Sequence, residues 1–196
     1  MTRHTLTGPS SFEQDIRRSL FRAEAAPVTS ADEALAFVRT VSIPDATHNC
    51  WAFRIGQTYR SDDDGEPGGT AGRPILTMID GQAMDQVAVV VTRWFGGTKL
   101  GAGGLVRAYG GTAAECLRRA EKIPLIAMTQ LGFHAGFADH ARLQARLRDW
   151  GAEMEAEQFD AFGARCTLRA PSADIDILTT RIVDLTAGRV VPRPVD

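Results

Sequence analysis

The first regular pattern of hydrophobic and polar positions along the chain has the period of a helix and covers residues 35–41. Leu35, Val38 and Val41 recur at spacings of three, which predicts one apolar helix face. Ser30 and Glu33 stand just before this run in the order of a capping box, in which a hydroxyl and a carboxylate satisfy the free amides of the first turn. We therefore predict a helix that begins after Ser30 and ends near Val41.

Two short apolar runs predict strands. Residues 50–55 form the first, which Gly56 stops, and a long polar loop is expected to follow. Residues 87–91 are a β-branched apolar run, typical of a strand buried on both faces, and this strand is predicted to continue to Phe95. From Leu105 onward, apolar or small residues recur at three and four, so a helix packed on a sheet is expected there.

A second series of elements follows Pro124, which breaks the helical pattern. Its order is strand, helix, strand, strand, helix, strand, and this is the order of a ferredoxin-like domain. The sequence thus predicts an α+β protein of two domains, residues 1–125 and 126–196. The elements expected in the second domain are residues 129–137, 139–150, 152–159, 165–170, 172–186 and 190–194.

Composition and charge narrow the functional classes. The 196 residues are 44% hydrophobic and 23% charged, which suits a globular protein with a buried core. The net charge of −2 gives no basic excess, so a nucleic-acid site has to be a local patch. Three scattered cysteines indicate reduced structural thiols. Because no signal peptide or membrane-spanning run is visible, we expect a cytoplasmic location.

An acidic segment is the first candidate for chemistry. Residues 61–72 hold four carboxylates and four glycines, a composition that predicts a loop. A calcium loop of the EF-hand type is excluded, because Pro67 and Arg73 occupy the positions of its glycine and its glutamate. The favoured interpretation is that the carboxylates cap helices and pair with arginines, since Gly72 and Pro74 open a predicted short helix. The alternative is a magnesium site with one or two ligands from Asp62, Asp63, Asp64 and Glu66.

The second candidate is a glycine-rich loop between the strand that ends near residue 95 and the helix after it. Glycines let backbone amides converge on an anion, a helix start adds positive potential, and Lys99, Arg93 and Arg107 complete a phosphate or carboxylate pocket. The match to nucleotide motifs is poor, because Leu100 stands where a Walker loop needs Ser or Thr, and Val106 where a dinucleotide loop needs glycine. Close helix–sheet packing remains an equal explanation of the glycines.

Nucleophilic catalysis has little support in the sequence. His48 stands two residues before Cys50, but alternation along a strand makes both of them packing or loop residues. No motif of a serine hydrolase, a zinc protease or a paired-cysteine site is present. Trp94, Phe95 and Tyr109 could stack on bases, although aromatic residues at a strand end and on an apolar helix stripe favour a core position.

Three segments, in this order along the chain, resemble the IMPACT/YigZ family: residues 48–50 (HNC), 63–74 (DDGEPGGTAGRP) and 93–109 (RWFGGTKLGAGGLVRAY). The resemblance spans roughly residues 12–122. Residues 17–21 (RRSLF) are similar to the family's basic-x-Ser-basic-Phe stretch, with Leu20 in the second basic place. The C-terminal part resembles the family's bacterial ferredoxin-like domain, which is similar to the fifth domain of elongation factor G.

The resemblance implies an N-terminal fold like the second domain of small-ribosomal-subunit protein five. Its eukaryotic members are translation regulators that compete for the activator of a translation-initiation-factor kinase, and for a bacterial two-domain chain it implies nucleic-acid binding. We therefore expect a non-catalytic protein with RNA, ribosome or translation-related protein partners. The alternatives are a metal-assisted enzyme acting on a phosphorylated or nucleotide substrate, which would use Mg²⁺, and a protein–protein adaptor. No resident cofactor and no metal ligands are predicted, and the candidate binding residues are His48, Asp63, Asp64, Glu66, Thr70, Arg93, Gly96, Gly97, Lys99, Gly101, Gly103, Gly104 and Arg107.

Overall fold

The computed structural model describes residues 2–195, and the chain divides into two compact units, residues 1–125 and 126–196. Each unit combines strands with helices and has its own hydrophobic core, so the predicted two-domain α+β class is confirmed. Within the described residues, no helix combines the length and the apolar character needed to cross a membrane.

A five-stranded antiparallel sheet forms the N-terminal unit, with the strand order β2-β3-β6-β4-β5. Its strands are β2 (Ser10–Ile16), β3 (Ser19–Pro27), β4 (His48–Ile55), β5 (Thr58–Asp62) and β6 (Val87–Trp94). The strands predicted at residues 50–55 and 87–95 are therefore confirmed as β4 and the central strand β6. A short separate pair joins β1 (His4–Leu6) to β7 (Lys122–Pro124).

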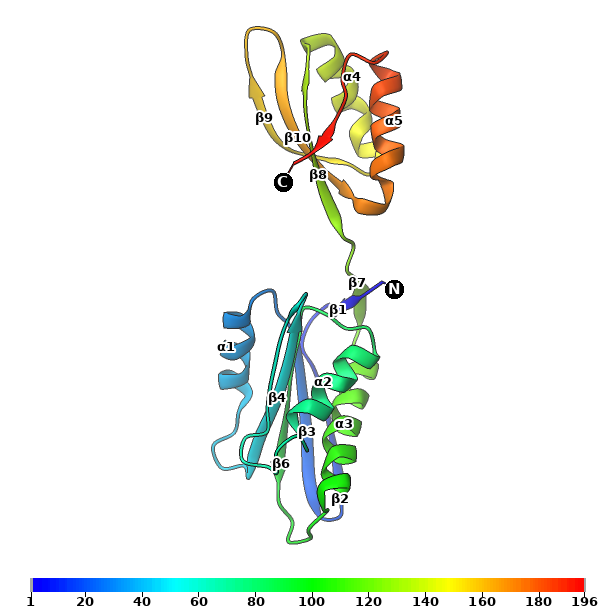
Figure 1. Ribbon diagram of the computed structural model, residues 1–196. Helices are drawn as coiled ribbons and strands as arrows, with labels where there is room; N and C mark the ends of the chain where they lie inside the picture. The colour runs from blue at the N-terminus through cyan, green and yellow to red at the C-terminus, as the bar shows by residue number, and fades with distance from the viewer. Residues whose placement is uncertain (1, 196) are drawn as a thin grey trace. The chain divides into compact units, whose positions relative to one another are not determined.

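Helices cover both faces of this sheet, as Figure 1 shows. Helix α1 (Ala31–Val41) packs on one face, while α2 (Gly72–Gly81) and α3 (Ala102–Arg119) pack on the other. This arrangement explains why β6 is buried along both faces. Ser30 begins α1 as predicted, because its side chain accepts the amide of Glu33 at 3.2 Å, and the Glu33 carboxylate reaches back to the amide of Thr29.

The polar loop predicted after Gly56 is wrong for residues 58–62, which form the edge strand β5. All five residues of β5 are exposed. An edge strand with both faces in solvent has no buried side, so it carries no alternation of apolar and polar residues for a sequence pattern to reveal. The β2–β3 hairpin was likewise absent from the prediction.

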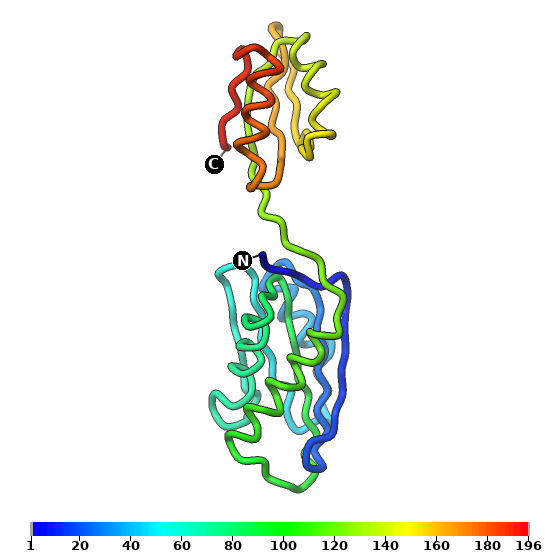
Figure 2. The backbone as a smooth tube through the Cα atoms, turned by 90° about the vertical axis from the view of Figure 1, so that its right-hand side faces the viewer, coloured from blue at the N-terminus to red at the C-terminus, as the bar shows by residue number. Residues whose placement is uncertain are grey.

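The turn of this hairpin packs against the glycine-rich loop that precedes α3. Arg17 and Arg18 both have positive φ, 47° and 71°, the conformation of the mirror-image turn that suits a two-residue hairpin. Gly96 lies so close to this turn that a Cβ atom there would penetrate the carbonyl oxygen of Arg18. Figures 1 and 2 both show the turn and the loop side by side at one end of the unit.

The C-terminal unit has a four-stranded antiparallel sheet of order β11-β8-β10-β9. Two helices pack on it, with a core of residues from all of these elements except β11. The predicted ferredoxin-like order is confirmed, although the last strand is only two residues long. The elements are β8 (Met128–Ala135), α4 (Phe137–Leu147), η1 (Arg148–Trp150), β9 (Glu153–Phe159), β10 (Ala164–Pro171), η2 (Ser172–Asp174), α5 (Ile175–Leu185) and β11 (Arg193–Pro194).

We predict that Gly96→Ala lowers the free energy of unfolding of the N-terminal unit by at least about 2 kcal/mol, because the new methyl group meets rigid backbone. Gly111→Ala is the control, since a Cβ atom there meets nothing within 4 Å and α3 gains about 0.5–1 kcal/mol from the better helix former. Urea unfolding followed by Trp51 and Trp94 fluorescence measures both. Equal effects of the two substitutions would contradict the close approach.

Candidate functional site

Asp63 organises the acidic loop as a cap for α2. Its carboxylate accepts the amides of Gly69 at 2.7 Å, Ala71 at 3.0 Å and Gly72 at 2.8 Å. Burial alone raises the pKa of Asp63, but the three amide donors outweigh burial and hold the pKa below its ordinary value. The structure thus supports the interpretation that this carboxylate caps a helix.

The neighbouring residues complete an ordered loop. The Asp64 carboxylate accepts the backbone amide of Asn49 on β4 at 2.6 Å, and the Asp62 carboxylate accepts the amide of Asp64 at 2.8 Å. Thr70 donates its hydroxyl to the carbonyl of Pro67 at 2.6 Å and closes a turn. Among residues 2–195, the carboxylates of this loop belong to no group of three side chains that could share a metal ion.

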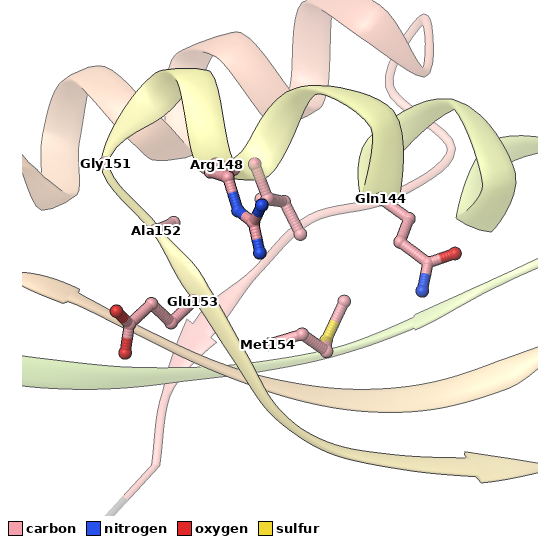
Figure 3. Close-up of a pocket in the computed structure, with 7 residues that line it drawn as sticks. Gln144, Arg148, Gly151, Ala152, Glu153 and Met154 are labelled. Carbon is pink, nitrogen blue, oxygen red and sulfur yellow. The ribbon is translucent and has the colours of Figure 1, made fainter.

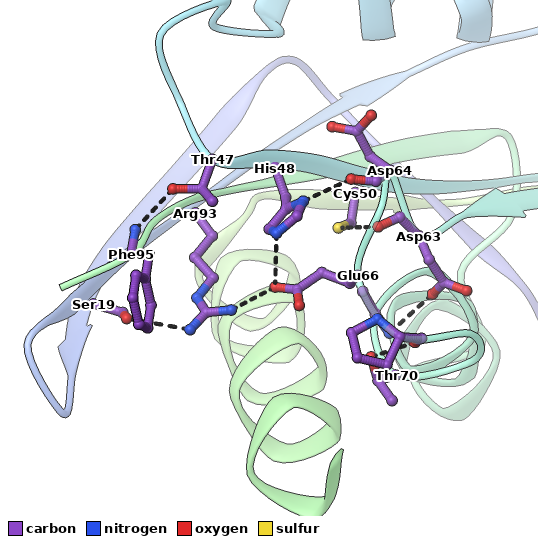
Figure 4. A network of polar contacts seen from close by, with 12 residues as sticks. Ser19, Thr47, His48, Cys50, Asp63, Asp64, Glu66, Thr70, Arg93 and Phe95 are labelled. Carbon is purple, nitrogen blue, oxygen red and sulfur yellow. Dashed lines mark hydrogen bonds and ion pairs between the residues drawn. The ribbon is translucent and has the colours of Figure 1, made fainter. Parts of the chain in front are cut away.

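Glu66 is the buried centre of a polar network, with a side chain only 4% exposed. Its Oε1 accepts Nη1 of Arg93 at 2.6 Å and the hydroxyl of Tyr109 at 2.7 Å, and Nε2 of His48 lies 3.8 Å away. Figure 4 shows His48 and Arg93 converging on this carboxylate from neighbouring strands. The network joins the acidic loop to β4, β6 and α3 at a single point.

Arg93 is held inside this network. Its guanidinium also contacts the Ser19 hydroxyl at 3.4 Å and lies over the rings of Phe21 and Phe95. With the residue only 5% exposed, the role of a surface phosphate contact expected for Arg93 is wrong. Arg93 faces inward because the buried carboxylate of Glu66, 27 residues away along the chain, needs a cation beside it. Tyr109 is completely buried as well, so it is not a base-stacking residue.

His48 and Cys50 lie on β4 without forming a catalytic pair. Nδ1 of His48 bonds to the Asp64 carbonyl at 2.7 Å, and since a carbonyl only accepts, this nitrogen carries the proton. The Cys50 thiol donates to the carbonyl of Asp63 at 3.0 Å. Burial and the nearby carboxylate of Glu66 raise the pKa of Cys50 to about 12, so the thiol stays protonated and is a poor nucleophile at neutral pH.

The glycine-rich loop leaves the first turn of α3 open. Gly101 is the N-cap, with φ 73° and no capping side chain, and the first helical hydrogen bond runs from Leu105 to its carbonyl. No acidic residue lies in this turn. Gly103 and Gly104 are within it, and Gly97, with its positive φ, lies in the loop before it. The positive end of the helix is therefore presented without a compensating side chain.

Basic residues lie in the hairpin turn, in the glycine-rich loop and in the first turns of α3. A hollow of about 260 Å³ lies between the hairpin turn and α3, and none of its lining residues is acidic or belongs to the acidic loop. Within residues 2–195, the exposed side chains of Arg17, Arg18, Lys99 and Arg107 form no ion pair. We call these four residues the basic rim. The hollow is lined by Ile16, Arg17, Leu100, Gly104, Arg107 and Ala108.

Two members of the basic rim, Arg17 and Arg18, were not among the predicted binding residues. A signal for them exists in the sequence, since two strand-like segments flank the two-residue Arg-Arg pair, the spacing of a tight hairpin. The structure separates the roles of the acidic loop and the glycine-rich loop. Asp63 and Glu66 face internal donors, whereas Arg17 and Arg107 line a hollow that no residue of the acidic loop borders.

The C-terminal unit has a larger hollow of about 570 Å³ at the C-terminal end of α4, shown in Figure 3. Its charged side chains are Arg148 and Glu153, and no histidine or cysteine lines it. The lining lacks the nucleophile–base arrangement that covalent catalysis needs.

Comparison with known proteins adds an independent observation. Residues 17–117 match the model of the Impact N-terminal domain, and residues 133–189 match a domain of unknown function, DUF1949. The chain is 48% identical to "IMPACT family member in pol 5'region" of Thermus thermophilus, over 89% of this chain and 97% of that protein. It is 30% identical to "IMPACT family member YigZ" of Escherichia coli, over 92% and 91% of the two chains.

More distant similarity extends to animals and to solved structures. Rat "Protein IMPACT" is 39% identical over 43% of this chain and 29% of its own length. A crystal structure of a hypothetical protein aligns with a TM-score of 0.73 at 28% identity, covering 100% of this chain and 98% of that one. Both units of the chain therefore have a counterpart in a single solved protein.

We predict that Glu66→Gln lowers the free energy of unfolding of the N-terminal unit by about 3–5 kcal/mol, because it leaves the buried Arg93 cation without its counter-charge. Tyr109→Phe is the control, since it removes one hydrogen bond from the same carboxylate and costs about 1 kcal/mol. Urea unfolding measures both variants. If the two losses were the same, the buried ion pair would not be the dominant interaction.

The lowered pKa of Asp63 predicts that the N-terminal unit loses stability as the pH becomes acidic. The carboxylate contributes its full stabilisation above the unfolded pKa of about 3.9, and this contribution disappears as pH falls through the lower folded pKa. Asp63→Asn should therefore lower the free energy of unfolding by about 1–3 kcal/mol at pH 7, with a difference from wild type that shrinks below about pH 4. The exposed Asp45→Asn serves as the control, and a pH-independent difference for Asp63→Asn would contradict the assignment.

Proposed function

Because this chain belongs to the IMPACT family, we propose that it is a non-catalytic RNA-binding protein of translation whose basic rim contacts RNA phosphates. The observation that carries the proposal is an open helix start beside a hollow lined by Arg17 and Arg107, with the exposed Arg18 and Lys99 next in the hairpin turn and the glycine-rich loop. Anions bind at such helix starts through free amides and the positive end of the helix dipole.

The geometry of α3 supports phosphate contact in detail. The side chain of Arg107 lies along the first turn of α3, since its Nη1 is 3.6 Å from where a Cβ atom of Gly103 would stand. Open amides and a guanidinium are thus directed to the same region, and arginine can bind two phosphate oxygens at once. Glycines at the first turn keep side chains from blocking a phosphate that approaches the amides.

The hairpin turn adds an argument from strain. A positive φ is common for glycine and asparagine but costs an arginine on the order of 1 kcal/mol. Arg17 and Arg18 both adopt it, and the turn is held in place by the packing of Gly96. Two arginines held in this strained conformation, beside the loop and helix that carry Lys99 and Arg107, support a binding role.

The overall charge limits the strength of this binding. At a net charge of −2 the protein is not attracted to RNA as a whole, so affinity depends on the few contacts of the basic rim. With three or four phosphates neutralised, the affinity for single-stranded RNA should fall about 20- to 50-fold between 50 and 200 mM salt. Such weak and salt-sensitive binding suits a protein that docks transiently on RNA or on ribosomes.

We predict that Lys99→Glu combined with Arg107→Glu reduces the affinity for a fluorescein-labelled single-stranded RNA at least tenfold, because it removes two phosphate contacts and adds two repulsive charges. Fluorescence anisotropy at 50 mM salt measures the affinity. Arg39→Glu combined with Arg60→Glu is the matched control, since both arginines are exposed and the charge change is the same.

Capture of the tagged protein from its own cytosol, with and without nuclease, distinguishes RNA binding from a role as a protein–protein adaptor. Loss of RNA or ribosomes in the Lys99/Arg107 variant, but not in the control variant, supports the proposal. Unchanged RNA binding by the Lys99/Arg107 variant would overturn it. A protein partner retained after nuclease by both variants would instead favour an adaptor.

A further inference from the structure

Three metal-binding types of side chain meet inside the C-terminal unit. His140 on α4, Glu157 on β9 and Cys166 on β10 each direct one ligand atom toward the others, and all three atoms lie within 4.8 Å of one another. None of these residues lines the 570 Å³ hollow, which lies at the other end of the interface between α4 and β9. The cluster is therefore a separate feature of this unit.

A β-bulge turns Glu157 toward this cluster. Opposite β10, Leu168 pairs with Met154 and Thr167 pairs with Ala156, so Glu155 is an extra residue in β9. Without the extra residue, strict alternation from the inward Met154 would direct residue 157 away from the helices. With it, Glu157 pairs with the buried Cys166 and contacts His140 instead. Bulges commonly re-aim a side chain in this way at functional sites.

His140, Glu157 and Cys166 are only partly bonded to one another and could each bind a further atom. Nε2 of His140 is 2.9 Å from Oε1 of Glu157, but the Cys166 thiol has only a 3.8 Å contact with the carbonyl of Ala164. His140 is 7% exposed and Cys166 1% exposed, whereas the side chain of Glu157 is 23% exposed. The cluster is thus buried on two sides and open to solvent on the side of Glu157, next to the unpaired edge of β9.

We propose that His140, Glu157 and Cys166 bind one divalent transition-metal ion, with Zn²⁺ the best match to a thiolate, an imidazole and a carboxylate. In a tetrahedral zinc site such ligand atoms stand about 3.5 Å apart, and the three atoms of the cluster already lie within 4.8 Å of one another. The three protein ligands leave a fourth position for water or for an external ligand. This inference does not depend on the function proposed for the basic rim.

The test is a titration of the untagged full-length protein with Zn²⁺ by calorimetry and with Co²⁺ by visible absorption. We expect one equivalent of metal per chain, a rise in the melting temperature of the C-terminal unit, and a thiolate-to-cobalt charge-transfer band. Cys166→Ser should abolish the band and lower the Zn²⁺ affinity about tenfold or more.

Glu157→Gln is the second variant, because it is half-buried, preserves a hydrogen bond to His140 and should lower affinity without unfolding the unit. The controls are Cys116→Ser, a buried cysteine of the other unit, and His134→Asn, an exposed histidine that bonds to Asp160. Neither control should change metal binding. Failure to take up a stoichiometric metal, or equal uptake by Cys166→Ser and wild type, would overturn the proposal.

Discussion

The burial of Glu66 beside Arg93 is the interaction on which the N-terminal unit depends. A carboxylate at 4% exposure is tolerated only with a cation and further donors, and Arg93 on β6 and Tyr109 on α3 supply them. The pair fixes the acidic loop against the sheet, and this loop in turn delivers Asp63 to the start of α2. The carboxylates of Asp63 and Glu66 are therefore bonded within the fold.

With Asp63 and Glu66 bonded internally, the exposed cations proposed to bind RNA lie near the start of α3. The glycine-rich loop serves two purposes there. Gly96 allows the hairpin turn to approach, which brings Arg17 and Arg18 beside the helix, and Gly101 leaves the first turn without a capping side chain. Packing and anion binding are thus compatible explanations of the same glycines, because one set of residues creates the contact and another exposes the amides.

The C-terminal unit differs, since its polar cluster lies between α4 and the sheet and is open to solvent only on the side of Glu157. A single extra residue in β9 changes which side of the strand Glu157 faces, and so turns a surface carboxylate into a partner of His140 and Cys166. The two units therefore differ in where their candidate binding side chains lie. The N-terminal unit presents cations at its surface, whereas the C-terminal unit gathers His140, Glu157 and Cys166 beside a strand edge.

The sequence by itself determined the elements whose burial follows a regular period. Helix α1 with its Ser30 cap, the doubly buried β6, and the ferredoxin-like order of the second domain all follow from local pattern, because one face or both faces of each element are apolar. Only the tertiary structure decided the partners of the charged residues. Arg93 and Arg107 have the same chemistry, yet one is buried against Glu66 and the other is free, because long-range pairing between strands and helices sets which cation meets a buried carboxylate.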